Sequence, residues 1–233
     1  MDRVVLITGG TGALGGAVTR AFLDDGATVA VTYRNGAEYE RLSASAGAGD
    51  RLRGYATDVT DASSVRDSVG RVEGELGPIA ALVHVAGGYF DATTVATTTD
   101  ETWELMMNLN LRSAFVCARA VLPGMAERRG GKIVTVSSRA ALRVFPGVGA
   151  YAASKAGLIA LTEVIAAEGA ESNVQANVVL PSIIDTAVNR KAMPDVDPST
   201  WVRPEELASV ILFLCSPAAD RISGASIPVY GRA

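Results

Sequence analysis

Short β-branched segments alternate with longer helix-patterned segments along almost the whole chain. Seven segments predict strands, at residues 3–8, 27–33, 51–57, 79–85, 131–137, 174–180 and 225–230. Helical patterns between them begin near Gly12, Glu38, Asp61, Glu101, Tyr151 and Pro204. Strands joined by right-handed helical crossovers form a parallel sheet that is covered on both faces. The alternation therefore predicts an α/β fold with a doubly wound parallel sheet of about seven strands.

Length and composition indicate one domain. The chain has 233 residues, 48% of them hydrophobic, which is enough for one large α/β domain and too few for two of ordinary size. We expect a single domain over residues 1–233. Residues 185–204 break the alternation with three prolines and mixed charge, so we expect a substrate lid at about 186–203.

The charge and the cysteines exclude several classes of function. A net charge of -4 provides no basic field for nucleic acid or an anionic membrane, and we expect neither partner. Cys117 and Cys215 lie far apart without metal-ligand spacing, so no metal site is expected. Because residues 1–8 run straight into a strand pattern, we expect no leader segment, and apolar runs such as 208–215 are expected to be too short to cross a bilayer. We expect a cytoplasmic protein.

The ends of the first three predicted strands indicate a dinucleotide site. In "TGGTGALGGAV", Gly9, Gly12 and Gly15 follow the first strand and open the first helix, where glycines allow a tight turn and close approach to a pyrophosphate. Glycine-rich loops also occur in ordinary turns, but this position favours dinucleotide binding.

The second and third strand ends suggest which dinucleotide binds. A carboxylate after the second strand would select NAD, whereas this chain has Tyr33 followed by Arg34, whose guanidinium suits a phosphate. We infer NADP(H) rather than NAD(H), with Asn35 as a weaker contact; a solvated surface Arg34 is the alternative. Asp58 is expected to accept from the adenine amino group or to cap the next helix, and we favour adenine.

Tyr151 and Lys155 lie four residues apart at the head of an apolar helical pattern, so their side chains share one helix face. Ser138 closes the fifth predicted strand, thirteen residues before Tyr151. These residues resemble the active site of the short-chain dehydrogenases/reductases. The resemblance covers the chain end to end and includes "TGGTGALG", "HVAG" (84–87), "NLRSAF" (110–115) and "PSIIDT" (181–186).

The resemblance implies a Rossmann fold and the site residues. Asn110, Ser138, Tyr151 and Lys155 are the implied catalytic residues: Ser138 holds the substrate oxygen, Tyr151 transfers the proton, and Asn110 organises a relay water beyond Lys155. Lys155 and the oxidised nicotinamide are expected to lower the Tyr151 pKa from ~10 by about three pH units. The expected cofactor contacts are Gly9, Thr11, Gly12, Ala13, Leu14, Gly15, Tyr33, Arg34, Asn35, Asp58, Val59, Ala86, Gly87, Tyr151, Lys155, Pro181, Ile184 and Thr186.

The function implied is NADP(H)-dependent interconversion of a ketone or 3-oxoacyl carbonyl and a secondary alcohol. The generic resemblance is to 3-oxoacyl-carrier-protein reductases. A local likeness to quinonoid dihydropteridine reductases, in "VAGGYF" and residues 185–201, keeps a pteridine or quinone reductase as an alternative, although that family lacks the serine found here at Ser138. A non-catalytic NADP-binding sensor is a second alternative, which the retention of all four reacting positions disfavours.

Some residues depart from the family pattern. His84, the only histidine, stands where the family has an asparagine, and we expect a structural role with loss of hydrogen bonds that brace the sheet. Ala13 and Ser182 each stand where the family pattern has a glycine. Arg139 and Arg143 are interpreted as surface groups or salt-bridge partners.

The sequence also predicts self-association. The helix that follows Tyr151 carries apolar residues on faces that one sheet cannot cover at once, namely Leu158, Leu161, Val164 and Ile165. In relatives this helix packs against a second subunit in a four-helix bundle, which implies a homo-oligomer, a tetramer rather than a dimer. Ordinary burial against the sheet would account for about half of these residues.

Overall fold

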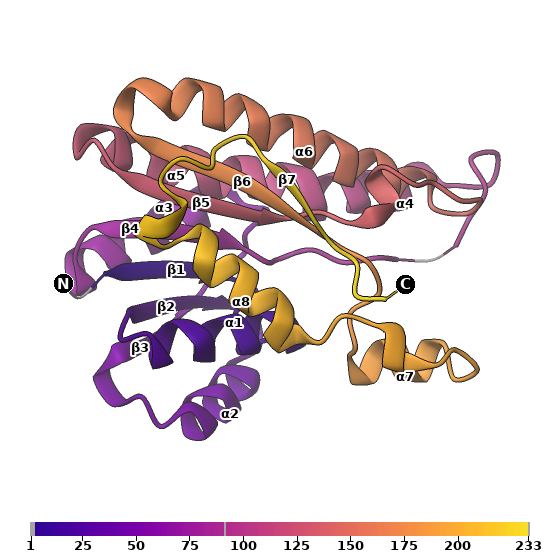
Figure 1. Ribbon diagram of the computed structural model, residues 1–233, viewed down its shortest axis with the longest axis horizontal. Coiled ribbons are helices and arrows are strands. Elements are labelled where there is room, and N and C mark those ends of the chain that lie inside the picture. Colours follow the sequence, from indigo (N-terminus) through magenta and orange to yellow (C-terminus); the bar gives the residue numbers. More distant parts are fainter. Residues whose placement is uncertain (1–2, 91, 233) are drawn as a thin grey trace.

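The computed structural model describes residues 3–90 and 92–232 and contains the predicted sheet (Figure 1). All seven predicted strands are confirmed and are parallel, in the order β3-β2-β1-β4-β5-β6-β7. They are β1 (Val4–Thr8), β2 (Thr28–Tyr33), β3 (Leu52–Ala56), β4 (Ile79–His84), β5 (Gly131–Val136), β6 (Val174–Pro181) and β7 (Ser226–Val229). The chain winds outward in opposite directions from β1 and β4. Ligands bind at such a switch point, outside the carboxyl ends of the strands.

Helices cover both faces of the sheet, as the alternation predicts. They are α1 (Ala13–Asp24), α2 (Gly36–Ala46), α3 (Ala62–Leu76), α4 (Asp100–Met107), α5 (Ser113–Glu127), α6 (Gly149–Gly169), α7 (Ala187–Ala192) and α8 (Pro204–Leu214). The six expected helix starts lie within two residues of observed ones. Helix α7 lies inside the expected lid and was not predicted as a helix.

Two hydrophobic cores result, one on each face of the sheet. Helices α1 and α8 pack over one face, and α3, α5 and α6 pack over the other. Strand β1 shows the division: Val5 and Ile7 belong to the first core, whereas Val4 and Leu6 belong to the second. Side chains alternate between the faces of a strand, so a strand with cover on both sides reads as an unbroken apolar run.

Helices α4 and α5 are joined by a π-helical turn, Asn108–Arg112. The sequence predicts one helix from near Glu101, and the structure confirms it as a rod with one wider turn in its middle. A π-helical turn holds one more residue than an α-helical turn and changes the direction in which side chains project. It places Asn110 in the interior of the protein.

Helix α6 with its following turn, Gly149–Ser172, is 24 residues long and by length and composition is apolar enough to cross a membrane. The expectation that the apolar runs are too short to do so is therefore wrong for this segment. Of its most apolar window, 44% is buried in the protein, and Leu158 and Ile165 lie in the interior. The same pattern is typical of a core helix in a soluble fold.

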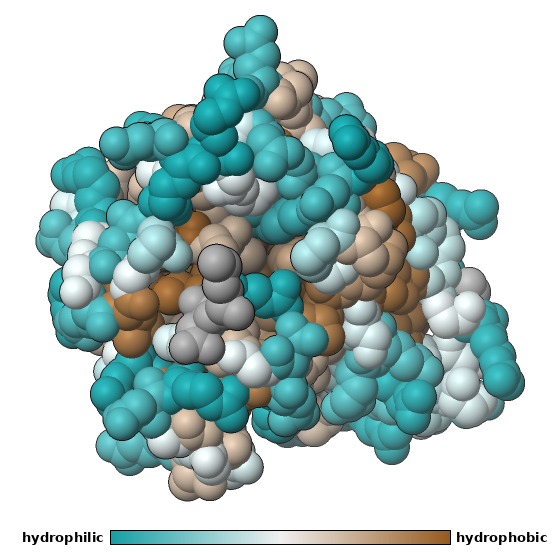
Figure 2. All heavy atoms as spheres, turned by 60° about the vertical axis from the view of Figure 1, so that its left-hand side comes forward, coloured by the Kyte–Doolittle hydropathy of each residue, from teal (hydrophilic) through white to brown (hydrophobic). Residues whose placement is uncertain are grey.

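The two ends of the sheet carry different surfaces. Figure 2 brings forward the end where β1 begins, and hydrophilic residues cover most of that face, with hydrophobic residues in narrow patches. At the opposite end, the loops that follow β4 and β5 extend beyond the strands (Figure 1). These loops expose large hydrophobic side chains, including Tyr89, Phe90 and Phe145.

Candidate active site

The loop between β1 and α1 is shaped by two glycines. Gly9 has a φ of +66°, and a Cβ at this position would lie 3.0 Å from the backbone of Ala86. A Cβ on Gly15 would overlap the carbonyl oxygen of Gly9. Gly12 caps α1 without a side-chain hydrogen bond, which leaves the first N–H groups of the helix without a side-chain acceptor. A helix N-terminus of this kind is suited to a phosphate group.

The end of β2 presents the residues expected at the adenosine half of the cofactor. The rings of Tyr33 and Tyr39 stack at 5.1 Å with an interplanar angle of 9°. Arg34 is exposed, and within residues 3–90 and 92–232 its guanidinium forms no ion pair. Asn35 caps α2, because its Oδ1 accepts from the backbone N–H of Ala37 at 3.0 Å. The amide NH₂ of Asn35 is left to donate to a ligand.

Glu38 is a residue that the sequence reasoning missed. The hydroxyl of Thr11, in the glycine loop, donates to Oε2 of Glu38 at 3.1 Å. This contact places a carboxylate beside the loop expected to hold phosphates, where it opposes a further negative charge. Its position in the first turn of α2 is the only signal for it in the sequence.

Asp58 forms a local turn after β3. Its Oδ1 accepts from the backbone N–H and the hydroxyl of Thr60, at 2.9 and 2.7 Å, and these bonds lower the pKa of Asp58. Asp61, not Asp58, caps α3. The capping alternative for Asp58 is therefore wrong, and the adenine contact stays a prediction. The neighbouring Val59 is buried.

Ser138 and Tyr151 meet beyond the carboxyl end of β5. Ser138 is extended, and its Oγ accepts from the backbone N–H of Ala140 at 3.1 Å. The Ser138 hydroxyl is thus free to donate to Tyr151. Burial raises the pKa of Tyr151, and the hydrogen bond with Ser138 acts in the opposite direction.

Lys155 is buried below Tyr151, on the same face of α6 as predicted. Its Nζ donates to the carbonyl oxygen of Val136 at 2.8 Å and lies 6.0 Å from the centroid of the Tyr151 ring. Burial lowers the pKa of Lys155 to about 8. The expected lowering of the Tyr151 pKa by Lys155 is not found in this arrangement, because burial outweighs other influences on the phenol.

Asn110 completes the cluster from the π-helical turn. Its Oδ1 accepts from the backbone N–H of Gly88 at 2.9 Å, and its Nδ2 donates to the Gly88 carbonyl at 3.0 Å and to Ser154 Oγ at 3.2 Å. A Cβ on Gly87 would lie 2.9 Å from Asn110 Oδ1 and 3.0 Å from Lys155 Nζ. Only a glycine allows the loop after β4 to approach both groups so closely.

His84 is hydrogen-bonded at both ring nitrogens, so the expected loss of bracing bonds is wrong. Nδ1 lies 2.9 Å from the hydroxyl of Thr8, and Nε2 lies 3.1 Å from Ser113 Oγ. The Ser113 hydroxyl donates to the carbonyl oxygen of Leu109 at 2.5 Å, so it can only accept from His84. His84 Nε2 therefore donates to Ser113 Oγ, and Nδ1 accepts from the Thr8 hydroxyl. Burial lowers the pKa of His84 to about 3. The neutral ring thus links β1, β4 and the start of α5, a structural role as predicted.

The remaining predicted residues follow β6. Pro181 ends the strand, Ile184 forms an isolated bridge with Val202, and Thr186 caps α7 by accepting from the backbone N–H of Asn189 at 3.2 Å. Within the described part of the chain, no cluster of three or more His, Cys, Asp or Glu side chains is arranged to hold a metal ion.

Neither arginine near Ser138 is a salt-bridge partner in the described residues. The guanidinium of Arg139 lies 5.7 Å from the centroid of the Tyr230 ring. Arg143 is exposed, in agreement with the surface interpretation.

Comparison with known proteins decides the family. The model of the short chain dehydrogenase family matches residues 3–197. The chain belongs to the short-chain dehydrogenase family. This short-chain dehydrogenase is 34% identical to the 3-oxoacyl-[acyl-carrier-protein] reductase FabG of Thermotoga maritima, over 98% of this chain and 96% of that one. It is 32% identical to the acetoacetyl-CoA reductase of Paracoccus denitrificans, over 97% and 96% of the two chains.

Solved structures of the short-chain dehydrogenase family share the fold. A structure described as ElxO with NADP bound superposes with a TM-score of 0.93 at 26% identity, over 99% of this chain and 98% of that one. The doubly wound sheet and its loops are therefore those of the family. Together with the family match, this likeness identifies the protein as an oxidoreductase.

Proposed function

We propose that this protein reduces a ketone or 3-oxoacyl carbonyl to a secondary alcohol, with NADPH as reductant and Tyr151 as proton donor, and catalyses the reverse reaction with NADP. The observation that carries the proposal is the cluster of Ser138, Tyr151, Lys155 and Asn110 at one end of the sheet. Three parts of the chain contribute to it: the turn after β5, helix α6 and the π-helical turn. Lys155 Nζ lies 6.0 Å from the centroid of the Tyr151 ring, and a Cβ on Gly87 would lie 2.9 Å from Asn110 Oδ1 and 3.0 Å from Lys155 Nζ. FabG and acetoacetyl-CoA reductase are relatives whose names describe such reductions.

The glycine loop, the open N-terminus of α1 and the close approach of Gly87 to Lys155 fit a nicotinamide dinucleotide. When bound, the cofactor supplies or accepts the hydride. Arg34 supports NADP(H), as does the NADP-bound structural neighbour, whereas Glu38 opposes the extra phosphate. We therefore propose a preference for NADP(H) that Glu38 limits.

The protein residues handle the proton and the orientation of the substrate. The Ser138 hydroxyl lies beside Tyr151, has its proton free to donate, and is placed to hold the same substrate oxygen. Tyr151 gives its phenolic proton to that oxygen as the alcohol forms, and the phenolate is reprotonated from the side of Lys155 and Asn110. An ammonium whose pKa is about 8 gives up a proton near neutral pH more readily than an ordinary lysine.

The direct test of this assignment is Tyr151→Phe. The variant is expected to lose all but a trace of carbonyl-dependent NADPH oxidation and to bind NADPH with nearly native affinity, because it lacks only the oxygen that carries the proton. Turnover is followed by NADPH absorbance and binding by fluorescence titration. Retention of more than a few per cent of native turnover would contradict the role of Tyr151. Cofactor binding without turnover in the native protein, on a broad panel of carbonyls, would favour the sensor alternative.

We also propose that residues 186–203 act as a lid over the substrate. The segment is attached at both ends: Ile184 bridges to Val202, and the carboxylate of Asp185 pairs with Arg190 at 2.6 Å. Between these attachments α7 exposes Val188. Limited proteolysis with and without NADPH tests the lid, and we expect cleavage in this segment to slow when the cofactor binds.

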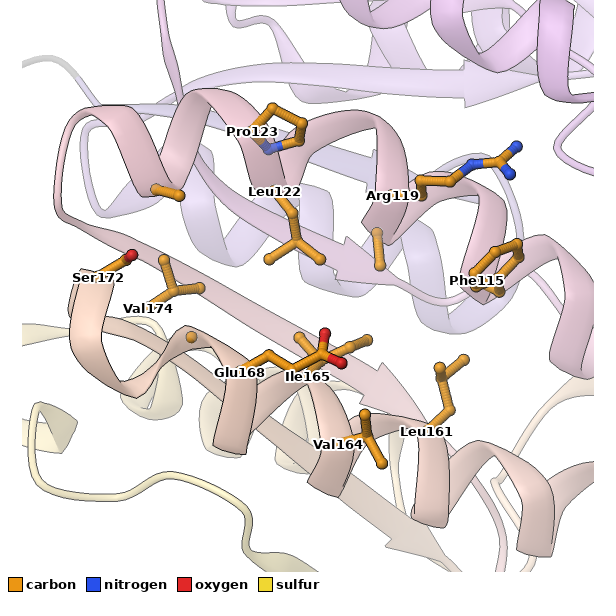
Figure 3. Close-up of a pocket in the computed structure, with 13 residues that line it drawn as sticks. Phe115, Arg119, Leu122, Pro123, Leu161, Val164, Ile165, Glu168, Ser172 and Val174 are labelled. Carbon is orange, nitrogen blue, oxygen red and sulfur yellow. The ribbon is translucent and has the colours of Figure 1, made fainter.

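The groove between α5 and α6 supports the proposed oligomer. Phe115 and Leu122 of α5 and Leu161 and Val164 of α6 line it, and Leu122 and Leu161 point from opposite helices into the gap between them (Figure 3). Of the four apolar residues singled out from the sequence, the two buried ones, Leu158 and Ile165, are accounted for by the fold itself. Leu161 and Val164 instead line the open groove, where a second subunit could cover them. We propose that a second copy of the chain covers this groove, in a tetramer rather than a dimer.

A further inference from the structure

Two loops next to Tyr151 expose large apolar side chains. The loop after β4 carries Tyr89 and Phe90, which are 49% and 61% exposed, and the loop before α6 carries Leu142 and Phe145, which are 59% and 60% exposed. Only 6% of the residues in the whole chain are aromatic, so these two loops are enriched in exposed aromatic rings. Large apolar groups exposed together mark a binding surface, whereas single exposed ones do not. We call these four residues the apolar rim.

The two loops are held side by side at the carboxyl end of the sheet. Thr93 of the first loop pairs with Val148 of the second in an isolated parallel bridge. A Cβ on Gly149 would lie 3.2 Å from Val95 Cγ2, which shows how closely the loops approach. The bridge joins the two halves of the apolar rim next to the start of α6, which carries Tyr151.

Tyr89 links the rim to the reacting group. Its ring lies 5.3 Å from the ring of Tyr151, centroid to centroid, at an interplanar angle of 75°. The pair has the edge-to-face geometry that aromatic rings prefer. Half of the Tyr89 surface remains exposed. A carbonyl that reaches the Tyr151 hydroxyl therefore brings its substituents close to the Tyr89 ring.

The rim offers an anionic substrate few cations to bind. In the loop after β4, residues 85–98 include no Lys or Arg, and their one charged residue is Asp91. In the second loop, Arg143 is exposed to solvent, and Arg139 lies over the Tyr230 ring. The four side chains of the apolar rim are themselves uncharged, so the rim favours an apolar substituent.

We propose that the substrates are ketones whose carbonyl carries an aromatic ring, and that Tyr89 selects them by packing against that ring. The inference rests on the proposed carbonyl reduction and names its substrate class. A carbonyl conjugated to an aryl ring lies in the plane of the ring, and hydrogen-bond donors approach a carbonyl oxygen in that plane. A ring packed along Tyr89 therefore keeps its carbonyl oxygen accessible to Tyr151, which stands at a steep angle to Tyr89.

The test compares two ketones with the same number of carbons, propiophenone and 3-nonanone, which share an ethyl group and differ in a phenyl or hexyl group. Their kcat/KM ratio is measured for the native protein, Tyr89→Ala and Tyr89→Leu, with Phe213→Ala as the control. Phe213 is an exposed ring on α8, away from the rim. The ratio, phenyl over hexyl, is expected to fall by roughly two- to tenfold in both Tyr89 variants, the size expected for one aromatic pair. It is expected to stay unchanged in Phe213→Ala.

The leucine variant keeps apolar bulk and removes only the ring. An unchanged ratio in Tyr89→Leu, or an equal fall in Phe213→Ala, overturns the role of Tyr89. A native protein that reduces other carbonyls but neither of these two ketones overturns the substrate class and leaves the proposed function standing. A native protein that reduces no carbonyl at all overturns the proposed function itself.

Discussion

Replacement of Lys155 by methionine is expected to stabilise the fold at neutral pH while abolishing turnover. Lys155 is 4% exposed, and burial lowers its pKa from 10.5 to about 8. Below pH 8 the side chain is charged in both the folded and the unfolded chain, and the buried charge then costs the folded state about 3 kcal/mol. Methionine has a similar length and removes this cost.

The lost hydrogen bond works against that gain. Without the ammonium, the carbonyl of Val136 has no donor from residue 155, at a cost of about 1 to 3 kcal/mol. The net effect of Lys155→Met at pH 7 is therefore a gain of about 0 to 2 kcal/mol in the free energy of unfolding.

The pH dependence separates the two contributions. Between pH 8 and 10.5 the folded lysine loses its proton while the unfolded lysine keeps it, so the native protein gains stability as the pH rises. The methionine variant lacks this gain, and its advantage is expected to fall by about 3 kcal/mol over the interval and to change sign. Urea unfolding of both proteins, followed by tryptophan fluorescence from pH 6 to 10.5, measures the difference. A difference that does not vary with pH would refute the reasoning.

Four further substitutions test other parts of the site and surface. Arg34→Ala should weaken NADPH binding about ten- to a hundredfold and leave NADH binding unchanged, and Glu38→Gln should tighten NADPH binding about two- to fivefold; titration with both cofactors checks each. His84→Leu leaves two buried hydroxyls without their partner and should lower the free energy of unfolding by about 2 to 4 kcal/mol, whereas a native-like urea midpoint would contradict the bonding described. Val164→Glu should shift the protein to a smaller assembly in light scattering; an unchanged mass would place the interface elsewhere.

The sheet was predictable because its signal is local. Each strand is a short apolar run, and the switch between β1 and β4 follows from the order of strands and helices along the chain. The proximity of the candidate catalytic residues was predictable for a related reason. Tyr151 and Lys155 share a helix face by spacing alone, and Ser138 follows β5, whose carboxyl end lies near the start of that helix.

What the sequence missed depends on partners far away in the chain. His84 bonds to Thr8 and Ser113, which are 76 and 29 residues distant, and nothing near His84 reveals either partner. Glu38 reaches the glycine loop 27 residues earlier. The direction of the Tyr151 pKa shift depends on how deeply the ring is buried, and spacing carries no information on burial.

The π-helical turn makes the rod of α4 and α5 one residue longer than a regular helix between the same two ends. Deletion of Leu109 would remove the extra residue and restore regular α-helical hydrogen bonding from α4 into α5. It would also rotate the following side chain by about 100° about the helix axis, and Asn110 would leave Gly88. The protein thus keeps an irregular helix where a regular one would fit, and a shorter, more regular chain would lose the Asn110 position on which the proposed proton relay depends.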